Sequence, residues 1–161
     1  MVKTVTDAEC ARLILETFPR AMRTLAHDMR DVPGATGTMP QYRILAQLHL
    51  RGPISMGELA ERQGVTLPTM TKIVSGLVER GQVERETDER DRRVVRLRLT
   101  SDGETLFRDM HRRMESRLAA LIRQMNEEER VALAEGLRGF HRVLSDAAPR
   151  DETGEQRAGR C

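Results

Sequence analysis

Apolar residues recur at helical spacing along most of this chain of 161 residues. The spacing predicts helices near residues 6–29, 40–51, 56–63, 67–80, 101–125 and 127–147. Between residues 83 and 99 the period shortens from about 3.6 residues to 2, because Val95, Leu97 and Leu99 alternate with arginines. This alternation predicts a two-stranded hairpin. We therefore expect a mostly α fold with a small β-hairpin.

The helices near 56–63 and 67–80 carry strong boundary signals. Ser55 and Glu58 have the spacing of a capping box, in which each side chain bonds the backbone amide of the other residue. Gly64 suits the left-handed conformation that ends a helix, and Thr66 can cap the helix that follows. A tight turn between two such helices is typical of a helix-turn-helix, and the hairpin after it would form a wing.

The second helix of this pair has one apolar face and one open face. Met70, Ile73, Val74 and Leu77 recur at helical spacing and should be buried. The residues on or beside the open face are small hydroxyl residues, one lysine and a proline: Thr66, Pro68, Thr69, Thr71, Lys72 and Ser75. Such side chains suit the major groove of double-stranded DNA, where they can contact base edges and phosphates. We expect these residues to bind DNA.

The tip of the hairpin, residues 88–93, reads Asp-Glu-Arg-Asp-Arg-Arg. The guanidinium groups of Arg90, Arg92 and Arg93 match phosphate oxygens and the electronegative minor groove, so we expect them to contact DNA. Asp88 is expected to orient one of these arginines, because a carboxylate beside a phosphate would repel it. The alternative is a winged-helix module that binds protein. A protein-docking wing would more often expose aromatic residues, which make up only 2% of this chain.

The segment GVTLPTMTKIVSGLVERGQVERETDERDRRVVRLRLTSDG, residues 64–103, resembles the winged-helix core of the MarR (multiple-antibiotic-resistance regulator) family of bacterial transcription factors. The match includes the wing motif Asp88-Glu89-Arg90 and the pair Leu99-Thr100, and the resemblance spans about residues 5–147. One departure is Leu67, because family members often carry arginine or lysine at this position. The resemblance implies a DNA-binding transcriptional regulator, expected to act as a repressor.

Further expectations come from the same resemblance. It implies a homodimer with two recognition helices one DNA turn apart, which suits a pseudo-palindromic operator. It also implies release by a small aromatic or anionic effector, bound between the dimerisation helices and the winged helix. The residues that we expect near this effector site are Met22, His27, Arg43 and Gln47. Arg43 would be the partner of an anionic group.

The domain organisation follows from the same patterns. We expect residues 38–100 to form the DNA-binding winged helix, and residues 1–30 and 101–147 to form a helical dimerisation region. The outer helices present more apolar length than a small winged helix can cover, which also favours a dimer. Residues 148–161 are polar without periodicity, which predicts a disordered tail.

Other kinds of chemistry have weaker signals. Cys10 lies near the start of the first helix, where some family members keep a redox-sensing cysteine, so a redox-sensing regulator is a second alternative. The four histidines and two cysteines match no zinc motif, and we expect neither a metal nor a cofactor. No nucleophile elbow, P-loop or dinucleotide fingerprint is present, so the chain should not be an enzyme. Without an apolar run of about 20 residues or a signal peptide, we expect a cytoplasmic location and no membrane partner.

Overall fold

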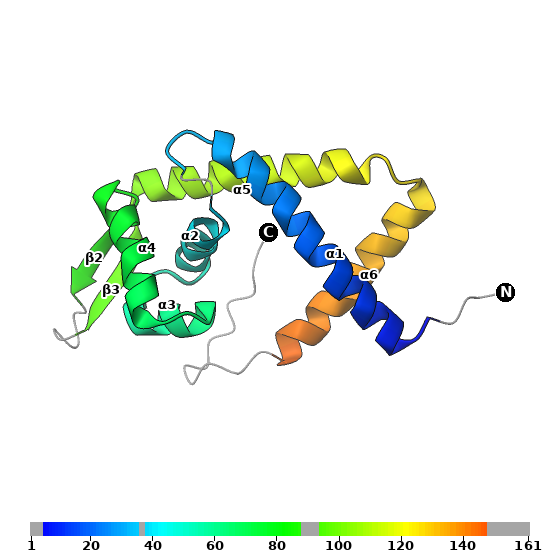
Figure 1. The fold of residues 1–161 in the computed structure, drawn as a ribbon, viewed down its shortest axis with the longest axis horizontal. Coiled ribbons are helices and arrows are strands. Elements are labelled where there is room, and N and C mark those ends of the chain that lie inside the picture. Colours follow the sequence, from blue (N-terminus) through cyan, green and yellow to red (C-terminus); the bar gives the residue numbers. More distant parts are fainter. Residues whose placement is uncertain (1–4, 36–37, 88–93, 148–161) are drawn as a thin grey trace. The chain divides into compact units, whose positions relative to one another are not determined.

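The computed structural model describes residues 5–35, 38–87 and 94–147 of the chain. Most of the described residues are helical, and a small antiparallel sheet accompanies them (Figure 1). In chain order the elements are α1 (Asp7–Asp28), the 3₁₀ turn η1 (Met29–Asp31), α2 (Met39–Arg51), β1 (Ile54–Ser55), α3 (Met56–Gln63), α4 (Leu67–Glu79), β2 (Val83–Thr87), β3 (Val95–Leu99), α5 (Ser101–Ile122) and α6 (Glu127–Ala147). The predicted fold class is confirmed, and Pro19 lies inside α1 without ending it.

The described residues fall into two compact units, one within residues 1–117 and one within residues 118–161. The first unit contains the helix-turn-helix, the sheet and the first part of α5, whereas the second contains the end of α5 and α6. These units are defined by packing. The predicted division by function, with a DNA-binding part at residues 38–100 and dimerisation helices on both sides, is a different one and stays a prediction. No helix in the described ranges is long and apolar enough to span a membrane.

The sheet has three strands in the order β1-β3-β2, so the expectation of a two-stranded wing is incomplete. The predicted hairpin is present, with Val83 opposite Leu99 and Arg85 opposite Leu97. The additional strand pairs Ile54 with Leu97 and Ser55 with Arg96. A strand of two residues is too short to show an alternating pattern, so periodicity could not predict β1.

The helix caps follow the sequence with one exception. In the predicted box, the backbone amide and the hydroxyl of Ser55 both donate to Glu58, at 3.0 and 2.6 Å, while the Glu58 amide donates back to the hydroxyl at 3.2 Å. These bonds hold the pKa of the Glu58 carboxyl below its ordinary value. Gly64 ends α3 in the left-handed conformation, at φ 63°.

Ser101 and Glu104 have the same spacing as Ser55 and Glu58, so the sequence also predicts a capping box there, and this prediction is wrong. Thr100 caps α5 instead: its hydroxyl oxygen accepts from the Gly103 amide at 3.1 Å. The Glu104 carboxylate is engaged elsewhere, with His49 of α2 at 2.7 Å. Thr100 and Ser101 are adjacent hydroxyl residues, and either could cap α5 by sequence alone. Thr100 is the cap because its hydroxyl also bonds to the preceding turn at Gly81.

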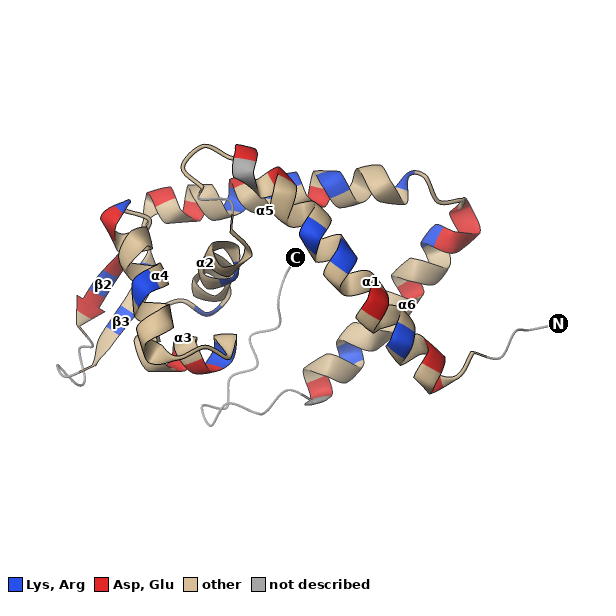
Figure 2. Cartoon of the chain, viewed as in Figure 1, with Lys and Arg blue, Asp and Glu red and all other residues tan. Residues whose placement is uncertain are grey.

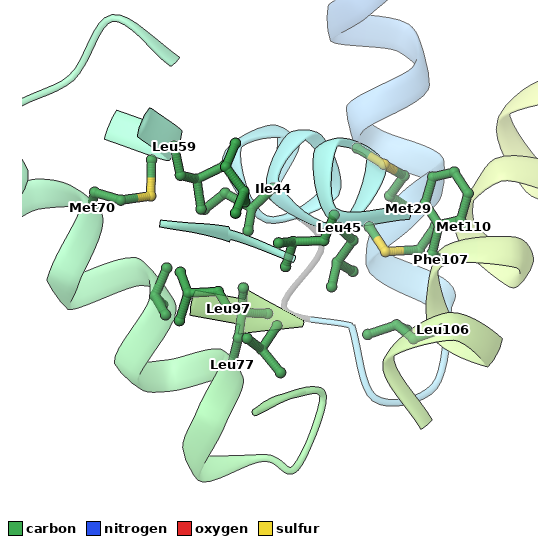
Figure 3. Packing of buried hydrophobic residues seen from close by; sticks show 14 of the residues in the cluster. Met29, Ile44, Leu45, Leu59, Met70, Leu77, Leu97, Leu106, Phe107 and Met110 are labelled. Atoms are coloured by element: carbon green, nitrogen blue, oxygen red, sulfur yellow. The ribbon is translucent and has the colours of Figure 1, made fainter. Parts of the chain in front are cut away.

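The hydrophobic core of the first unit gathers around α2 (Figure 3). Ile44 and Leu45 of α2 are almost fully buried, as are Leu59 of α3, Met70 of α4 and Leu97 of β3. Met110 of α5 and Met29 of η1 are also fully buried. The apolar side of α4 is therefore fixed against the rest of the unit, which leaves its other side open.

The turn between α4 and β2 contacts the start of α5. Gly81 adopts a positive φ of 67°, and its carbonyl oxygen accepts from the Thr100 hydroxyl at 2.5 Å. The Gln82 carbonyl oxygen accepts from the Thr100 amide at 3.2 Å. Gly103 is buried against this same carbonyl group: a β-carbon at Gly103 would lie 1.9 Å from the Gln82 oxygen. This close approach sets where the wing begins relative to α5.

A cluster of rings links α2 to α5 in the same unit. Phe107 of α5 packs on the ring of His49, with centroids 4.5 Å apart, and on the ring of Tyr42 at 5.7 Å. The Tyr42 hydroxyl and His111 Nδ1 are hydrogen-bonded at 2.8 Å. Burial raises the pKa of Tyr42. Partial burial also acts to raise the pKa of Glu104, but His49 and Arg108 outweigh it and hold that pKa below its ordinary value.

Candidate nucleic-acid interface

The open face of α4 carries most of the residues predicted to bind DNA. Met70, Val74 and Leu77 are buried on one side, with exposed fractions of 1%, 0% and 0%. The exposed residues are Thr66, Leu67, Pro68, Thr69, Thr71 and Lys72, whereas Ser75 is half-buried. The structure thus leaves the predicted threonines, Pro68 and Lys72 accessible to a ligand, and gives Ser75 less room.

Hydrogen bonds already constrain the hydroxyl groups on this face. The Thr66 hydroxyl oxygen caps α4 by accepting from the Thr69 amide at 3.4 Å. The hydroxyls of Thr66 and Thr69 also bond to one another at 2.9 Å. The Thr71 hydroxyl donates to the carbonyl oxygen of Leu67 at 2.8 Å. Lys72 is consequently the strongest hydrogen-bond donor that α4 presents to solvent.

Charge is sparse on α4 and mixed on the sheet (Figure 2). Within α4 the charged residues are Lys72 and Glu79. On the sheet, Arg98 of β3 makes ion pairs with Glu84 at 2.7 Å and with Glu86 at 3.5 Å, both on β2. These pairs hold the Arg98 guanidinium on the wing strands, so it is less available to a phosphate than an unpaired arginine would be.

The predicted wing tip lies outside the described residues. This applies to Asp88, Arg90, Arg92 and Arg93, and their proposed roles therefore stay predictions. Thr87 at the end of β2 pairs with Val95 at the start of β3, and this is the last pair of the hairpin before the wing-tip segment. The predicted tail, residues 148–161, also lies outside the described residues.

The residues proposed for an effector come from two helices. Met22 and His27 are exposed on α1, and the side chain of His27 is 80% exposed. Arg43 is exposed on α2, one turn before Gln47. The Gln47 side-chain oxygen is buried and has no hydrogen-bond partner among the described residues. Within the described ranges, no hydrogen bond or ion pair joins these four residues into one site, so their grouping stays a prediction.

Cys10 is exposed in the first turn of α1, and Thr6 caps this helix through the Glu9 amide. Within the described ranges, no group of three His, Cys, Asp or Glu side chains could hold a metal ion.

Leu67 is a surface feature that the helical spacing did not indicate. It precedes Met70 by three residues and Val74 by seven, which is the spacing of the buried stripe, yet it is 53% exposed. The buried stripe begins only at Met70. The available signal was the position itself, because Leu67 is the first residue of the helix and sits between Thr66 and Pro68.

A capped helix-turn-helix with an open second helix, followed by a small sheet, defines the class of winged-helix DNA-binding proteins. The sequence profile of the MarR family matches residues 38–95. YfiV of Bacillus subtilis, described as an uncharacterised HTH-type transcriptional regulator, is 31% identical over 110 residues, which cover 68% of this chain and 69% of YfiV. The chain belongs to the MarR family of winged-helix transcription regulators.

Solved structures agree with this fold. RV1404 from Mycobacterium tuberculosis superimposes with a TM-score of 0.75 at 25% identity, over 88% of this chain and 97% of that one. FabT from Streptococcus pneumoniae, solved in complex with DNA, has a TM-score of 0.64 at 24% identity, over 85% of this chain and 98% of that one.

Proposed function

We propose that this regulator binds a specific double-stranded DNA operator as a homodimer and acts as a repressor. The observation that carries the proposal is the two-sided character of α4. Its apolar side is committed to the core, and its other side exposes Thr69 and Lys72. A helix of this kind fits the major groove of B-DNA, where base edges can be read. FabT, a protein of similar fold, was solved in complex with DNA, which supports DNA binding as the function of this fold here.

Thr69 and Lys72 are the α4 residues with the clearest role in reading the groove. They lie three residues apart, on adjacent positions of the exposed helical face. Lys72 can donate to guanine oxygen and nitrogen atoms or to a phosphate, and a threonine hydroxyl can bond either kind of edge. Loss of one base contact should cost specific binding about 1–3 kcal/mol.

We expect Thr69→Ala and Lys72→Ala each to weaken binding to the preferred operator by that amount. Selection from a randomised duplex library, followed by titration of the recovered site, measures the effect. Glu79→Ala, which changes an exposed residue at the far end of α4, serves as the control and should leave affinity nearly unchanged. If the double variant Thr69→Ala/Lys72→Ala selects the same site with the same preference, these residues do not set specificity.

The homodimer is supported by apolar residues that the described chain leaves exposed. On α1 they include Leu13, Leu15 and Phe18, at 47%, 74% and 46% exposure. On α6 they include Leu133, Leu137 and Leu144, at 37%, 47% and 52%. The three leucines of α6 lie on one helical face, and Leu15 and Phe18 of α1 share a face as well. The described residues leave both faces exposed. A second copy of the chain would cover such stripes and would pair two α4 helices about a two-fold axis.

Sedimentation equilibrium should give a mass near twice the 18.3 kDa of one chain. Leu137→Asp should shift this equilibrium toward the monomer, because it would bury an unpaired carboxylate in the interface. Glu135→Lys changes an exposed charged position of the same helix and should leave the dimer intact. A monomeric mass for the unaltered chain at micromolar concentration would contradict the proposal.

We further propose that a small aromatic or anionic effector regulates DNA binding. The buried Gln47 oxygen supports it, because an unpaired acceptor could be satisfied by a ligand O–H group such as a phenol. Arg43 is one turn away on α2, where its guanidinium could pair with a carboxylate. An effector needs only to favour the DNA-incompetent arrangement, and about 1.4 kcal/mol of preference lowers operator affinity tenfold.

A thermal-shift screen of phenolic and aromatic carboxylates tests this regulation. At least one compound should raise the melting temperature and release the operator, and Arg43→Ala should reduce both effects for carboxylates. Arg51→Ala, an exposed arginine at the end of the same helix, is the control. If no compound stabilises the protein or releases DNA, the effector hypothesis is wrong.

A further inference from the structure

For a helix that reads DNA, the exposed face of α4 has many apolar groups and few hydrogen-bond donors. Leu67, at the first position of the helix, is 53% exposed, and Pro68 beside it is exposed as well. No Arg, Asn or Gln occurs between Leu67 and Glu79. Those three residue types make the bidentate hydrogen bonds that identify guanine and adenine in the major groove. Polar readout from α4 therefore depends on Lys72, the threonines and the half-buried Ser75.

The threonines have few hydrogens left to donate. The Thr71 hydroxyl hydrogen is used on the Leu67 carbonyl oxygen. Thr66 and Thr69 share a hydroxyl–hydroxyl bond in which one of them is the donor, so this pair retains one free hydroxyl hydrogen. The same exposed side chains also carry methyl groups, and the exposed Leu67 and Pro68 stand between Thr66 and Thr69 in the sequence. The first turn of α4 is consequently richer in apolar contact area than in donors.

We infer that Leu67, together with Pro68, reads thymine through its C5 methyl group. Thymine is the one base that presents a methyl group in the major groove, and apolar side chains contact it favourably. Cytosine has only a hydrogen at the same ring position, and the purine edges present hydrogen-bonding groups. The inference rests on the proposed binding of α4 to a specific DNA site, and it names the chemistry by which that site is chosen. Leu67 is then a specificity-determining residue, although a lone exposed leucine on another surface would require no explanation.

Replacement of thymine by deoxyuridine tests the inference, because it deletes only the methyl group. The probe is the duplex that the unaltered protein selects from a randomised library, with each thymine replaced in turn by deoxyuridine. At one or two positions of each half-site, the protein should bind the substituted duplex about fourfold more weakly, the factor expected for one methyl-sized apolar contact. Leu67→Ala should bind the parent duplex more weakly and should no longer distinguish thymine from deoxyuridine at those positions.

Leu50→Ala is the matched control, because Leu50 is a leucine of α2 with 68% exposure. It should retain the full thymine preference of the unaltered protein. If deoxyuridine is tolerated at every position, or if Leu67→Ala keeps the preference, the inference is wrong while the proposed function stands. Failure of the library to yield any preferred duplex would instead overturn the proposed function, and the inference with it.

Discussion

Gly103→Ala is expected to destabilise the fold by about 3 kcal/mol or more, at the upper end of the range for overpacked sites. The added β-carbon would lie 1.9 Å from the carbonyl oxygen of Gln82 and 2.8 Å from its carbonyl carbon. Both atoms are backbone, so no flexible side chain can move aside. Relief would require the turn at Gly81 and Gln82 to separate from α5, which would break the bonds that Thr100 makes to that turn.

Urea denaturation at a fixed protein concentration measures the effect as a lower midpoint with a similar slope. Gly57→Ala is the matched control, because Gly57 lies in α3 and a β-carbon there would meet nothing within 4 Å. Alanine in a helix is favoured over glycine by about 0.5–1 kcal/mol, so this variant should be slightly more stable than the unaltered protein. Equal midpoints for Gly103→Ala and the unaltered protein would show that the close backbone approach is absent.

Charge reversal at the wing tip is expected to have the largest effect on DNA binding. If Arg90 and Arg92 each contact a phosphate, Arg90→Glu/Arg92→Glu removes two contacts from each wing. At about 0.15 M salt, counterion release makes each contact worth roughly fivefold in affinity, so the two contacts of one wing contribute about twenty-fivefold. Binding to any sequence should fall by at least that factor. The slope of log affinity against log salt concentration should decrease by about one unit for each lost contact.

Fluorescence anisotropy titrations over a series of salt concentrations measure both quantities. Arg112→Glu/Arg123→Glu makes the same change in net charge at exposed positions outside residues 38–100, and is the control for the long-range effect of charge. It should leave the salt slope nearly unchanged. Wild-type affinity and slope in Arg90→Glu/Arg92→Glu would mean that the wing tip does not contact DNA, whatever the role of α4.

The sequence by itself determined the elements whose signals are local. The capping box of Ser55 and Glu58, the left-handed Gly64 and the cap at Thr66 each depend on residues within four positions of one another. The alternation over residues 95–99 likewise lies within a single strand. Such signals act before any tertiary contact forms, and they were sufficient to locate α3, α4 and the hairpin, and to separate the buried side of α4 from its open side.

Only the tertiary structure decided features that depend on residues distant in the chain. The strand β1 exists because Ile54 pairs with Leu97, and Thr100 rather than Ser101 caps α5 because its hydroxyl reaches Gly81. The exposure of Leu67 likewise depends on the tertiary structure. Its spacing from Met70 is that of the buried stripe, but whether a neighbouring element covers the first turn of α4 is decided by packing and not by periodicity.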